Sequence, residues 1–422
     1  MLQPVLPDVQ LTPTLEDARA ASIVLASAPT ALKNAGLGAM ANRLRENVDS
    51  ILEANREDLV RGAAHGLTAG LLDRLALDGP RVAALADAVE QVALLTDPVG
   101  EVVRGSTMPN AIKLSQVRVP FGVIGVIYEA RPNVTVDLAA LALKSGNAVV
   151  LRGGSAAENT NRVLVELVQD AISSAGLPRH AVQTIDPLGR AGATALMQAR
   201  GYVDVLIPRG SANLISTVVT EAKVPVIETG SGVVHIFLDE SADSQWAIDI
   251  VHNSKVQRPS VCNALETLLV HRASAARLLP GVLGKLTEAG VTIHADARVR
   301  ALYASAVPAT DEDWATEYMS LDVSVAIVDS LDEAIAHIRR YSTGHTESII
   351  TNDLANAERF LNEVDSASVM VNASTRFTDG AEFGFGAEVG ISTQKLHARG
   401  PMGLSELTST KWIVRGSGQV RA

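Results

Sequence analysis

The sequence predicts an α/β protein with a parallel sheet and helices on both of its faces. Aromatic residues make up only 3% of the 422 residues, and Ala, Val, Leu and Gly are abundant, which is typical of helices packed on aliphatic strands. From residue 133 onward, short apolar strands alternate with helical segments, which is the pattern of β-α-β units. A chain of this length is expected to form two or three domains with a large buried core.

Composition and charge exclude several classes of protein. The single cysteine allows no internal disulfide, so a cytoplasmic location is expected. Residues 1–30 lack a basic segment followed by an apolar block, which argues against a signal peptide, and apolar runs such as 122–128 are too short to span a membrane. The formal net charge is −11 and no Lys/Arg-rich run occurs. Nucleic acid and membrane are therefore not expected as partners.

The first 128 residues divide into a helical part and a strand-like part. Apolar residues recur at helical spacing in residues 15–25, 32–59 and 82–95, and Pro80 is suited to the start of the last helix. Between residues 101 and 128, the runs VVRG, KLSQVRV and GVIGVIY are rich in β-branched residues. We expect a helical lead-in followed by a sheet extension.

The next hundred residues predict one parallel sheet. Helices are expected to end at residue 144 and to cover 156–174, 191–200 and 212–222, with strands at 147–152, 181–186, 203–207 and 224–227. Ligands of such sheets bind at the carboxyl ends of the strands. Four small, Gly-rich segments fall there: RGGS at 152–155, DPLGRAG at 186–192, PRGS at 208–211 and ETGSG at 228–232.

A second alternating stretch begins near residue 241 and predicts a separate domain. Its expected helices are 242–256, 273–289, 331–341 and 354–364, and its expected strands are 265–271, 323–328 and 348–351. The chain ends in a strand-like run, KWIVRGSGQVR, at 411–421.

The RGGS segment is a candidate phosphate site, because backbone N–H groups at a helix start can bind an anion and Arg152 is nearby for a ribose phosphate. An ordinary strand-to-helix turn also uses Gly and Ser, and no GxGxxG fingerprint lies near it. PRGS repeats the same strand-turn-helix arrangement. The two segments together favour one shared nucleotide site.

Cys262 is the candidate nucleophile. A lone cysteine is often an inert core residue, but Cys262 lies in the polar run QRPSVCN, where Arg258 can favour the thiolate. A polar, positively flanked thiol on a loop is suited to attack on a carbonyl. No GxSxG elbow and no zinc-type Cys/His set occurs, so neither a serine hydrolase nor a metal site is expected.

Four long segments carry a resemblance to the aldehyde dehydrogenase superfamily and, within it, to the gamma-glutamyl phosphate reductases. The stretch VPFGVIGVIYEARPNVTVDLAALALKSGNAVVLRGG at 119–154 resembles the start of the family's nucleotide domain, and VQRPSVCNALETLLVH at 256–271 its nucleophile segment. Residues 328–349 and 387–412 resemble two further signatures. The resemblance covers nearly the whole chain.

The resemblance implies three structural parts. These are a Rossmann-like nucleotide domain over residues 1–104 and 126–235, an α/β catalytic domain over 236–400, and a small β oligomerisation extension over 105–125 and 401–422. The extension implies a homo-oligomer.

The resemblance also implies the reaction, which is NADPH-dependent reduction of L-glutamyl 5-phosphate to L-glutamate 5-semialdehyde and phosphate in proline biosynthesis. The upstream glutamate kinase is then a candidate partner. The alternatives are a phosphate-independent aldehyde dehydrogenase for another small aldehyde, and a catalytically silent nucleotide-binding protein of the same fold. Retention of Cys262 and Asn133 argues against the silent protein.

By resemblance, Cys262 forms a thioester, and the Cys262 backbone N–H and the Asn133 amide stabilise the oxyanion. The role of Glu228 is open, because it stands where hydrolytic relatives carry their water-activating glutamate, a function that an acyl-phosphate reductase does not need. The expected NADPH contacts are Arg152, Gly153, Gly154, Ser155, Pro187, Leu188, Arg209, Gly210, Ser211, Glu228, Gly230 and Glu317.

Five further residues are expected to bind the substrate. Guanidinium groups bind carboxylate or phosphate bidentately, which suits Arg131, Arg258 and Arg376. Glu129 is suited to the α-ammonium group, and His345 is chosen for its position in the GHTES segment.

Overall fold

The computed structural model describes residues 11–129 and 131–421 and divides them into two compact units. The first unit contains residues 11–228, 384–390 and 402–421, and the second contains residues 229–383 and 391–401. Residues 1–10 of the predicted lead-in, and of the segment judged not to be a signal peptide, lie outside the described residues. The predicted three-part division of the chain stays a prediction.

Five helices open the first unit. They are α1 Thr12–Leu25, α2 Thr30–Glu46, α3 Val48–Ala64, α4 Ala69–Leu75 and α5 Gly79–Leu94. The prediction of one helical segment over 32–59 was wrong, because Asn47 leaves the helical conformation (φ −119°, ψ 27°) and its amide donates to the Arg43 carbonyl. Such a side-chain bond competes with helical hydrogen bonding and separates α2 from α3. Pro80 lies in the first turn of α5, as predicted.

A four-stranded parallel sheet forms the core of the first unit. Its strands are β3 Val123–Tyr128, β4 Ala148–Arg152, β5 Val182–Thr184 and β6 Val205–Arg209, in the order β5-β4-β3-β6. The connecting helices are α6 Pro132–Lys144, α7 Glu158–Ser174, α8 Gly189–Gln198 and α9 Ala212–Glu221. The strand order reverses between β3 and β6, which is where doubly wound sheets bind nucleotides at the carboxyl ends of their strands.

Residues 224–227 do not form the predicted strand. They contribute one isolated bridge, between Val226 and Leu206, flanked by hydrogen bonds from the Leu206 N–H to the Pro225 carbonyl and from the Ile227 N–H to the Leu206 carbonyl. Pro225 has no N–H to donate, so the strand ladder cannot extend through it.

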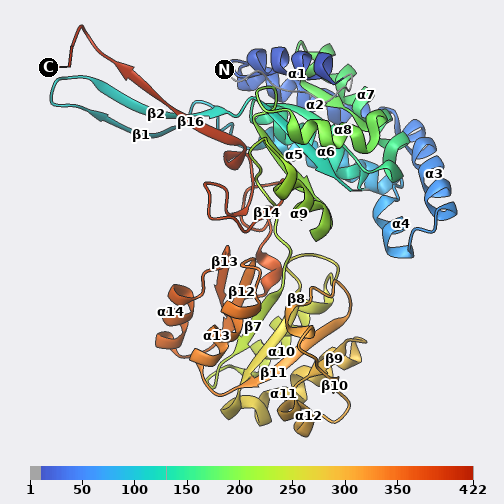
Figure 1. The fold of residues 1–422 in the computed structure, drawn as a ribbon, viewed down its shortest axis with the longest axis vertical. Helices are drawn as coiled ribbons and strands as arrows, with labels where there is room; N and C mark the ends of the chain where they lie inside the picture. Colours follow the sequence, from blue (N-terminus) through green and yellow to red (C-terminus); the bar gives the residue numbers. More distant parts are fainter. Residues whose placement is uncertain (1–10, 130, 422) are drawn as a thin grey trace. The chain divides into compact units, whose positions relative to one another are not determined.

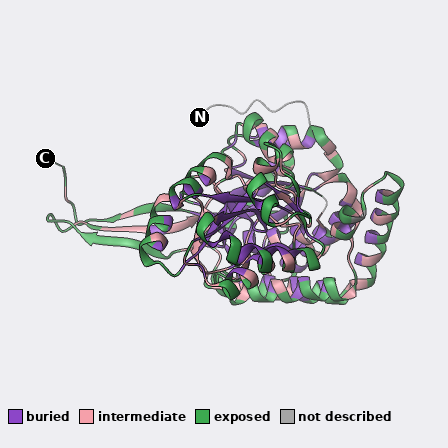
Figure 2. Ribbon diagram, turned by 90° about the horizontal axis from the view of Figure 1, so that it is seen from below, coloured by how far each residue is buried: buried purple, intermediate pink, exposed green. Residues whose placement is uncertain are grey.

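A three-stranded antiparallel ribbon extends from the rest of the first unit (Figure 1). It consists of β1 Val102–Thr107, β2 Lys113–Pro120 and β16 Thr408–Arg415, in the order β1-β2-β16. All six residues of β1 are exposed, and Figure 2 shows the ribbon largely in the colours of exposed and partly exposed residues. The ribbon therefore presents an unpaired strand edge.

The second unit contains a seven-stranded parallel sheet in the order β10-β9-β11-β8-β7-β12-β13. The strands are β7 Val234–Leu238, β8 Leu265–His271, β9 Thr292–Ala295, β10 Val307–Pro308, β11 Asp322–Val328, β12 Thr346–Ile350 and β13 Ser368–Val371. Helices α10 Ser244–Val256, α11 Arg272–Glu288 and α12 Ala297–Leu302 pack in one apolar cluster, and α13 Leu331–Tyr341 and α14 Leu354–Glu363 in another. A short hairpin pairs β14 Ile391–Ser392 with β15 Gly400–Pro401.

The α/β class with parallel sheets is therefore confirmed. Within the described residues, no helix is both long enough and apolar enough to cross a membrane.

Candidate active site

Cys262 lies in the turn between α10 and β8, is half-buried and forms no disulfide. The turn is closed by a hydrogen bond from the Ala264 N–H to the Val261 carbonyl. Three other predicted site residues also precede strands of this sheet: Gly230 before β7, Glu317 before β11 and His345 before β12. The candidate residues of the second unit therefore gather at the amino ends of its strands, unlike the ligand sites expected at carboxyl ends.

Gly232 supports the Cys262 backbone from one side. A Cβ atom at Gly232 would collide with the Cys262 carbonyl group, so only glycine fits there. The Gly232 N–H donates to Glu317 Oε1 at 2.8 Å. Thr343 holds the residues beside Gly232, because its hydroxyl donates to the Ser231 carbonyl and accepts from the Val233 N–H. The segment that supports Cys262 is thus fixed in position.

Asn263 fixes the nucleophile's turn from the other side. Its side-chain amide donates to the Thr378 carbonyl at 2.8 Å, and its backbone carbonyl accepts from the Thr375 hydroxyl at 2.7 Å. The Thr378 hydroxyl in turn accepts from Thr346, which contacts His345 Nδ1 at 2.8 Å.

His345 is fully buried, and burial lowers its pKa to about 4, so the imidazole is neutral near pH 7. The structure places it behind Thr346 and Thr378. The predicted contact of His345 with the substrate stays a prediction. Its complete burial argues against such a contact.

Two guanidinium groups accompany the thiol. Arg376 Nε donates to Gln257 Oε1 at 2.9 Å. Burial lowers the pKa of Arg376, the negative charges of Asp379 and Cys262 act in the opposite direction, and Arg258 adds to the lowering. Because the charges of Cys262 and Arg258 both act on Arg376, these side chains lie close enough to interact electrostatically. Positive charge of this kind favours a thiolate and an anionic substrate.

A buried ion pair lies close to the same segment. Lys255 Nζ is 2.8 Å from Glu266 Oε2, and both side chains are fully buried. Glu266 Oε1 accepts the N–H of Met319, which has a left-handed conformation (φ 54°) that is uncommon for a residue with a side chain. Burial raises the pKa of Glu266 to about 7, against the opposing charge of Lys255.

Glu317 is held in position by the hydrogen bond from Gly232 and by the hydrogen bond that fixes the nearby Met319. It lies two residues before Met319, and it accepts the Gly232 N–H. Burial raises the pKa of Glu317, and the hydrogen bond from Gly232 acts in the opposite direction.

In the first unit, Arg152 and Arg209 end β4 and β6, at the predicted edge of the sheet. Glu129 follows β3, and both of its carboxylate oxygens accept hydrogen bonds from Ser211, from the N–H at 2.9 Å and from the hydroxyl at 2.7 Å. Glu129 is thereby bound to the turn between β6 and α9. Its contact with a substrate ammonium group stays a prediction.

Three backbone N–H groups in and after the RGGS segment have carboxylate partners. The Gly153 N–H donates to Asp186 Oδ1 at 2.6 Å, beside Pro187 and Leu188 in the turn after β5. At the start of α7, the N–H groups of Asn159 and Thr160 donate to Asp58 of α3. Asp186 thus occupies one amide that the sequence pattern offered to a phosphate, and Asp58 occupies two at the start of the following helix.

Asn133 lies in the first turn of α6, where its amide nitrogen donates to Asp137 Oδ2 at 3.2 Å. Burial raises the pKa of Asp137 to about 6, while the Asn133 amide and the charge of Arg209 act in the opposite direction. One amide hydrogen of Asn133 is thus held by Asp137, and the other is left for a second acceptor.

Comparisons with known proteins show the family of this chain. The model of the aldehyde dehydrogenase family matches residues 8–302 and 306–413. The gamma-glutamyl phosphate reductase of Leifsonia xyli subsp. xyli is 68% identical over 412 residues, covering 98% of each chain. That of Clavibacter michiganensis subsp. michiganensis is 67% identical over 417 residues, covering 99% of this chain and 96% of the relative.

A crystal structure of gamma-glutamyl phosphate reductase from Thermotoga maritima superposes with a TM-score of 0.96 at 46% identity, covering 98% of this chain and 100% of that one. The chain belongs to the gamma-glutamyl phosphate reductases of the aldehyde dehydrogenase family. The family's fold extends further, since an acetylating aldehyde dehydrogenase from Geobacillus thermoglucosidasius gives a TM-score of 0.70 at 17% identity over 98% of each chain.

Three other predicted residues of this reductase-family chain are Arg131, Glu228 and Gly230. Arg131 precedes α6 and is partly buried, and Glu228 is partly buried at the last position of the first unit's opening segment. The Gly230 N–H donates to the Ile391 carbonyl at 2.9 Å. Among the described residues, no group of three or more His, Cys, Asp or Glu side chains is suited to a metal ion.

Sequence reasoning missed the carboxylates and the lysine that support the site, namely Asp58, Asp137, Asp186, Lys255 and Glu266. Only two carried a local signal: Asp137 stands four residues after Asn133 on one helix face, and Glu266 interrupts an otherwise apolar strand.

Proposed function

We propose that this chain reduces L-glutamyl 5-phosphate to L-glutamate 5-semialdehyde and phosphate with NADPH, the second step of proline synthesis from glutamate. The observation that carries the proposal is the position of Cys262, whose backbone is held between Gly232 and Asn263 and whose thiol lies beside two guanidinium groups. The 55–68% identical relatives named gamma-glutamyl phosphate reductase support the same reaction.

The first unit suits a dinucleotide. Its strand order reverses beside β3, and Arg152 and Arg209 end β4 and β6, the two strands that flank β3, which gives positive charge where nucleotide phosphates bind. NADPH, when bound, supplies hydride. Arg152, Gly153, Gly154, Ser155, Pro187, Leu188, Arg209, Gly210, Ser211, Glu228, Gly230 and Glu317 remain the proposed contacts.

The Cys262 thiolate attacks the acyl carbon, the acyl–oxygen bond breaks, and phosphate leaves with the electron pair, giving a thioester. Hydride reduces the thioester to a thiohemiacetal, whose collapse releases the aldehyde and restores the thiolate. The Cys262 N–H and the Asn133 amide stabilise the oxyanion of each tetrahedral intermediate. Arg131, Arg258 and Arg376 bind the anionic groups of the substrate, with Glu129 on its ammonium group.

The reaction measured in reverse distinguishes this function from a hydrolytic aldehyde dehydrogenase. We expect NADPH formation from L-glutamate 5-semialdehyde to require phosphate, because release of the thioester then needs that nucleophile. Arsenate should replace phosphate, since it has the same shape and charge. Full-rate turnover without either anion would mean that water resolves the thioester, with Glu228 as general base.

The homo-oligomer, the upstream glutamate kinase as partner and a cytoplasmic location stay predictions.

A further inference from the structure

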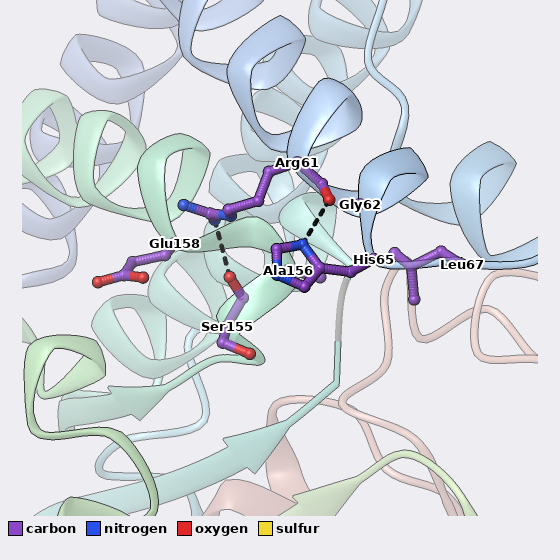
Figure 3. A pocket seen from close by; sticks show the side chains of 7 residues that line it. All are labelled: Arg61, Gly62, His65, Leu67, Ser155, Ala156 and Glu158. Carbon is purple, nitrogen blue, oxygen red and sulfur yellow. Dashed lines mark hydrogen bonds between the residues drawn. The ribbon is translucent and has the colours of Figure 1, made fainter.

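A cavity of about 350 Å³ opens between the end of α3 and the turn after β4 in the first unit. Figure 3 shows its lining, in which Arg61 and His65 come from the α3 side and Ser155 from the opposite side. We propose that this cavity binds the 2′-phosphate of NADPH, so that Arg61, His65 and Ser155 select NADPH over NADH. The proposal rests on the proposed function, which it deepens by assigning the cofactor's distinguishing group to named side chains.

Arg61 is the anchor of the cavity. Its Nη2 atom donates to the Ser155 carbonyl at 2.8 Å and to Asp58 Oδ1 at 2.6 Å (Figure 3 shows the bond to Ser155). These two bonds fix the guanidinium plane while its other N–H groups remain for an anion. The side chain is 35% exposed, which gives a ligand access to it.

Asp58 does not simply cancel the charge of Arg61. It is fully buried, and besides Arg61 it accepts the N–H groups of Asn159 and Thr160 and the Thr160 hydroxyl. Its negative charge is therefore shared with the positive end of the α7 dipole. Arg61 keeps attraction for a second anion on its exposed side.

His65 adds a second nitrogen ligand. Its Nδ1 atom lies 2.7 Å from the Arg61 carbonyl, an acceptor, so Nδ1 carries the proton. Its Nε2 atom is not used in this contact and can bind a phosphate oxygen.

Ser155 and Glu158 define where the phosphate can lie. Ser155 is exposed, and its small side chain leaves the cavity open. Glu158 lines the cavity as well, and its charge disfavours an anion beside it. The phosphate is therefore confined to the wall formed by Arg61 and Ser155.

The position in the fold identifies the ligand. In doubly wound nucleotide folds, the residues after the second strand contact the ribose 2′ position, where an acidic side chain selects NADH and an arginine accommodates the phosphate of NADPH. Here the second strand is β4, and RGGS after it contains no carboxylate. Arg152 Nε donates to the Gly189 carbonyl at 3.3 Å, whereas Arg61 contacts Ser155 itself.

The test measures binding of adenosine 2′,5′-bisphosphate and of 5′-AMP to the full-length protein by calorimetry. We expect Arg61→Ala and Ser155→Glu each to weaken the bisphosphate by about tenfold or more, the scale of a lost charge-assisted contact, and to leave 5′-AMP within about twofold. Ser155→Glu retains the contact between Arg61 and Asp58, so its effect does not depend on a structural role of Arg61. Arg56→Ala is the matched control, because Arg56 lies on the same helix and pairs with Glu53.

Equal losses for both nucleotides, or no loss in either variant, would overturn the proposal. Its failure is distinguishable from that of the proposed function. Phosphate-dependent turnover with equal use of NADH and NADPH would retain the reaction and remove this site. Arg61-dependent binding of the bisphosphate without turnover of L-glutamyl 5-phosphate would do the reverse.

Discussion

Two residues, Gly232 and Asn263, hold the backbone of Cys262 in position in different ways. Gly232 contributes no side chain and lets two backbone segments meet, whereas Asn263 contributes hydrogen bonds to the segment from Thr375 to Thr378. Both act on the backbone of the nucleophile and neither needs to contact the substrate. Precise positioning of this kind supports a reaction in which small displacements are costly.

Substituting Gly232 tests this positioning. We expect Gly232→Ala to lower kcat by about 100-fold, because the new Cβ displaces the Cys262 carbonyl and with it the nucleophile. Nucleotide binding, measured by calorimetry, should stay unchanged. Gly284→Ala in α11 is the control, since a Cβ there meets open space. Wild-type kcat in Gly232→Ala would show that the close approach is irrelevant to catalysis.

Asp137 makes the orientation of Asn133 dependent on pH. Above a pH of about 6 its carboxylate accepts from the Asn133 amide, and below that pH the protonated carboxyl is a weaker acceptor that also carries an O–H donor. We expect kcat of the reverse reaction to fall with an apparent pKa near 6 as the pH is lowered from 8 to 5. In Asp137→Asn, whose side chain cannot titrate, this limb should disappear from the pH profile. An unchanged limb would assign the titration to another group.

At the scale of elements, the pair of Lys255 on α10 and Glu266 on β8 holds the strained turn at Met319. We expect Lys255→Met to lower the free energy of unfolding by about 3–5 kcal/mol, because Glu266 then stays buried without its partner. The double variant Lys255→Met/Glu266→Leu should recover much of this loss. Urea unfolding of the full chain measures both values.

The exposed pair of Lys285 and Glu288 provides the matched comparison, since its side chains are 50% and 74% exposed. Lys285→Met should cost less than about 1 kcal/mol. Equal costs for the buried and the exposed lysine would contradict the role given to the buried pair.

The spacing of apolar residues in the sequence correctly predicted those helices and strands in which buried and exposed residues follow a regular pattern. The bounds of β8 and α13 agree with the sequence prediction residue for residue, because each is a regular apolar strand or an amphipathic helix. The predicted strand at 224–227 and the single helix over 32–59 were wrong because single residues, Pro225 and Asn47, interrupt otherwise regular runs. β7 was missed because its short apolar run directly follows a Gly-rich turn.

In the candidate site, too, some residues could be predicted from the sequence and others could not. Cys262 and Asn133 lie in recognisable segments, so sequence could propose them. Asp58 lies about a hundred residues from the helix start that it caps, and Asp186 lies 33 residues from Gly153. Such pairings depend on tertiary structure and leave no periodic or spacing signal in one sequence.

At the scale of the whole molecule, the residues proposed for catalysis are distributed over two units. The first contains the nucleotide-type sheet and Asn133, and the second contains Cys262. The ribbon of the first unit also exposes apolar side chains on β1 and β16, including Val102, Trp412 and Val414. Exposed apolar residues along strand edges favour the predicted pairing of subunits.

Covalent capture tests the central claim, which is that Cys262 carries the glutamyl group. The full-length protein is mixed with L-glutamyl 5-phosphate in the absence of NADPH, quenched in acid, digested and analysed by mass spectrometry. We predict that the peptide containing Cys262 gains one glutamyl group, that about one phosphate is released per chain, and that added NADPH discharges the group as the semialdehyde. Formation of semialdehyde by Cys262→Ala, or a glutamyl group bound at another residue, would contradict the mechanism.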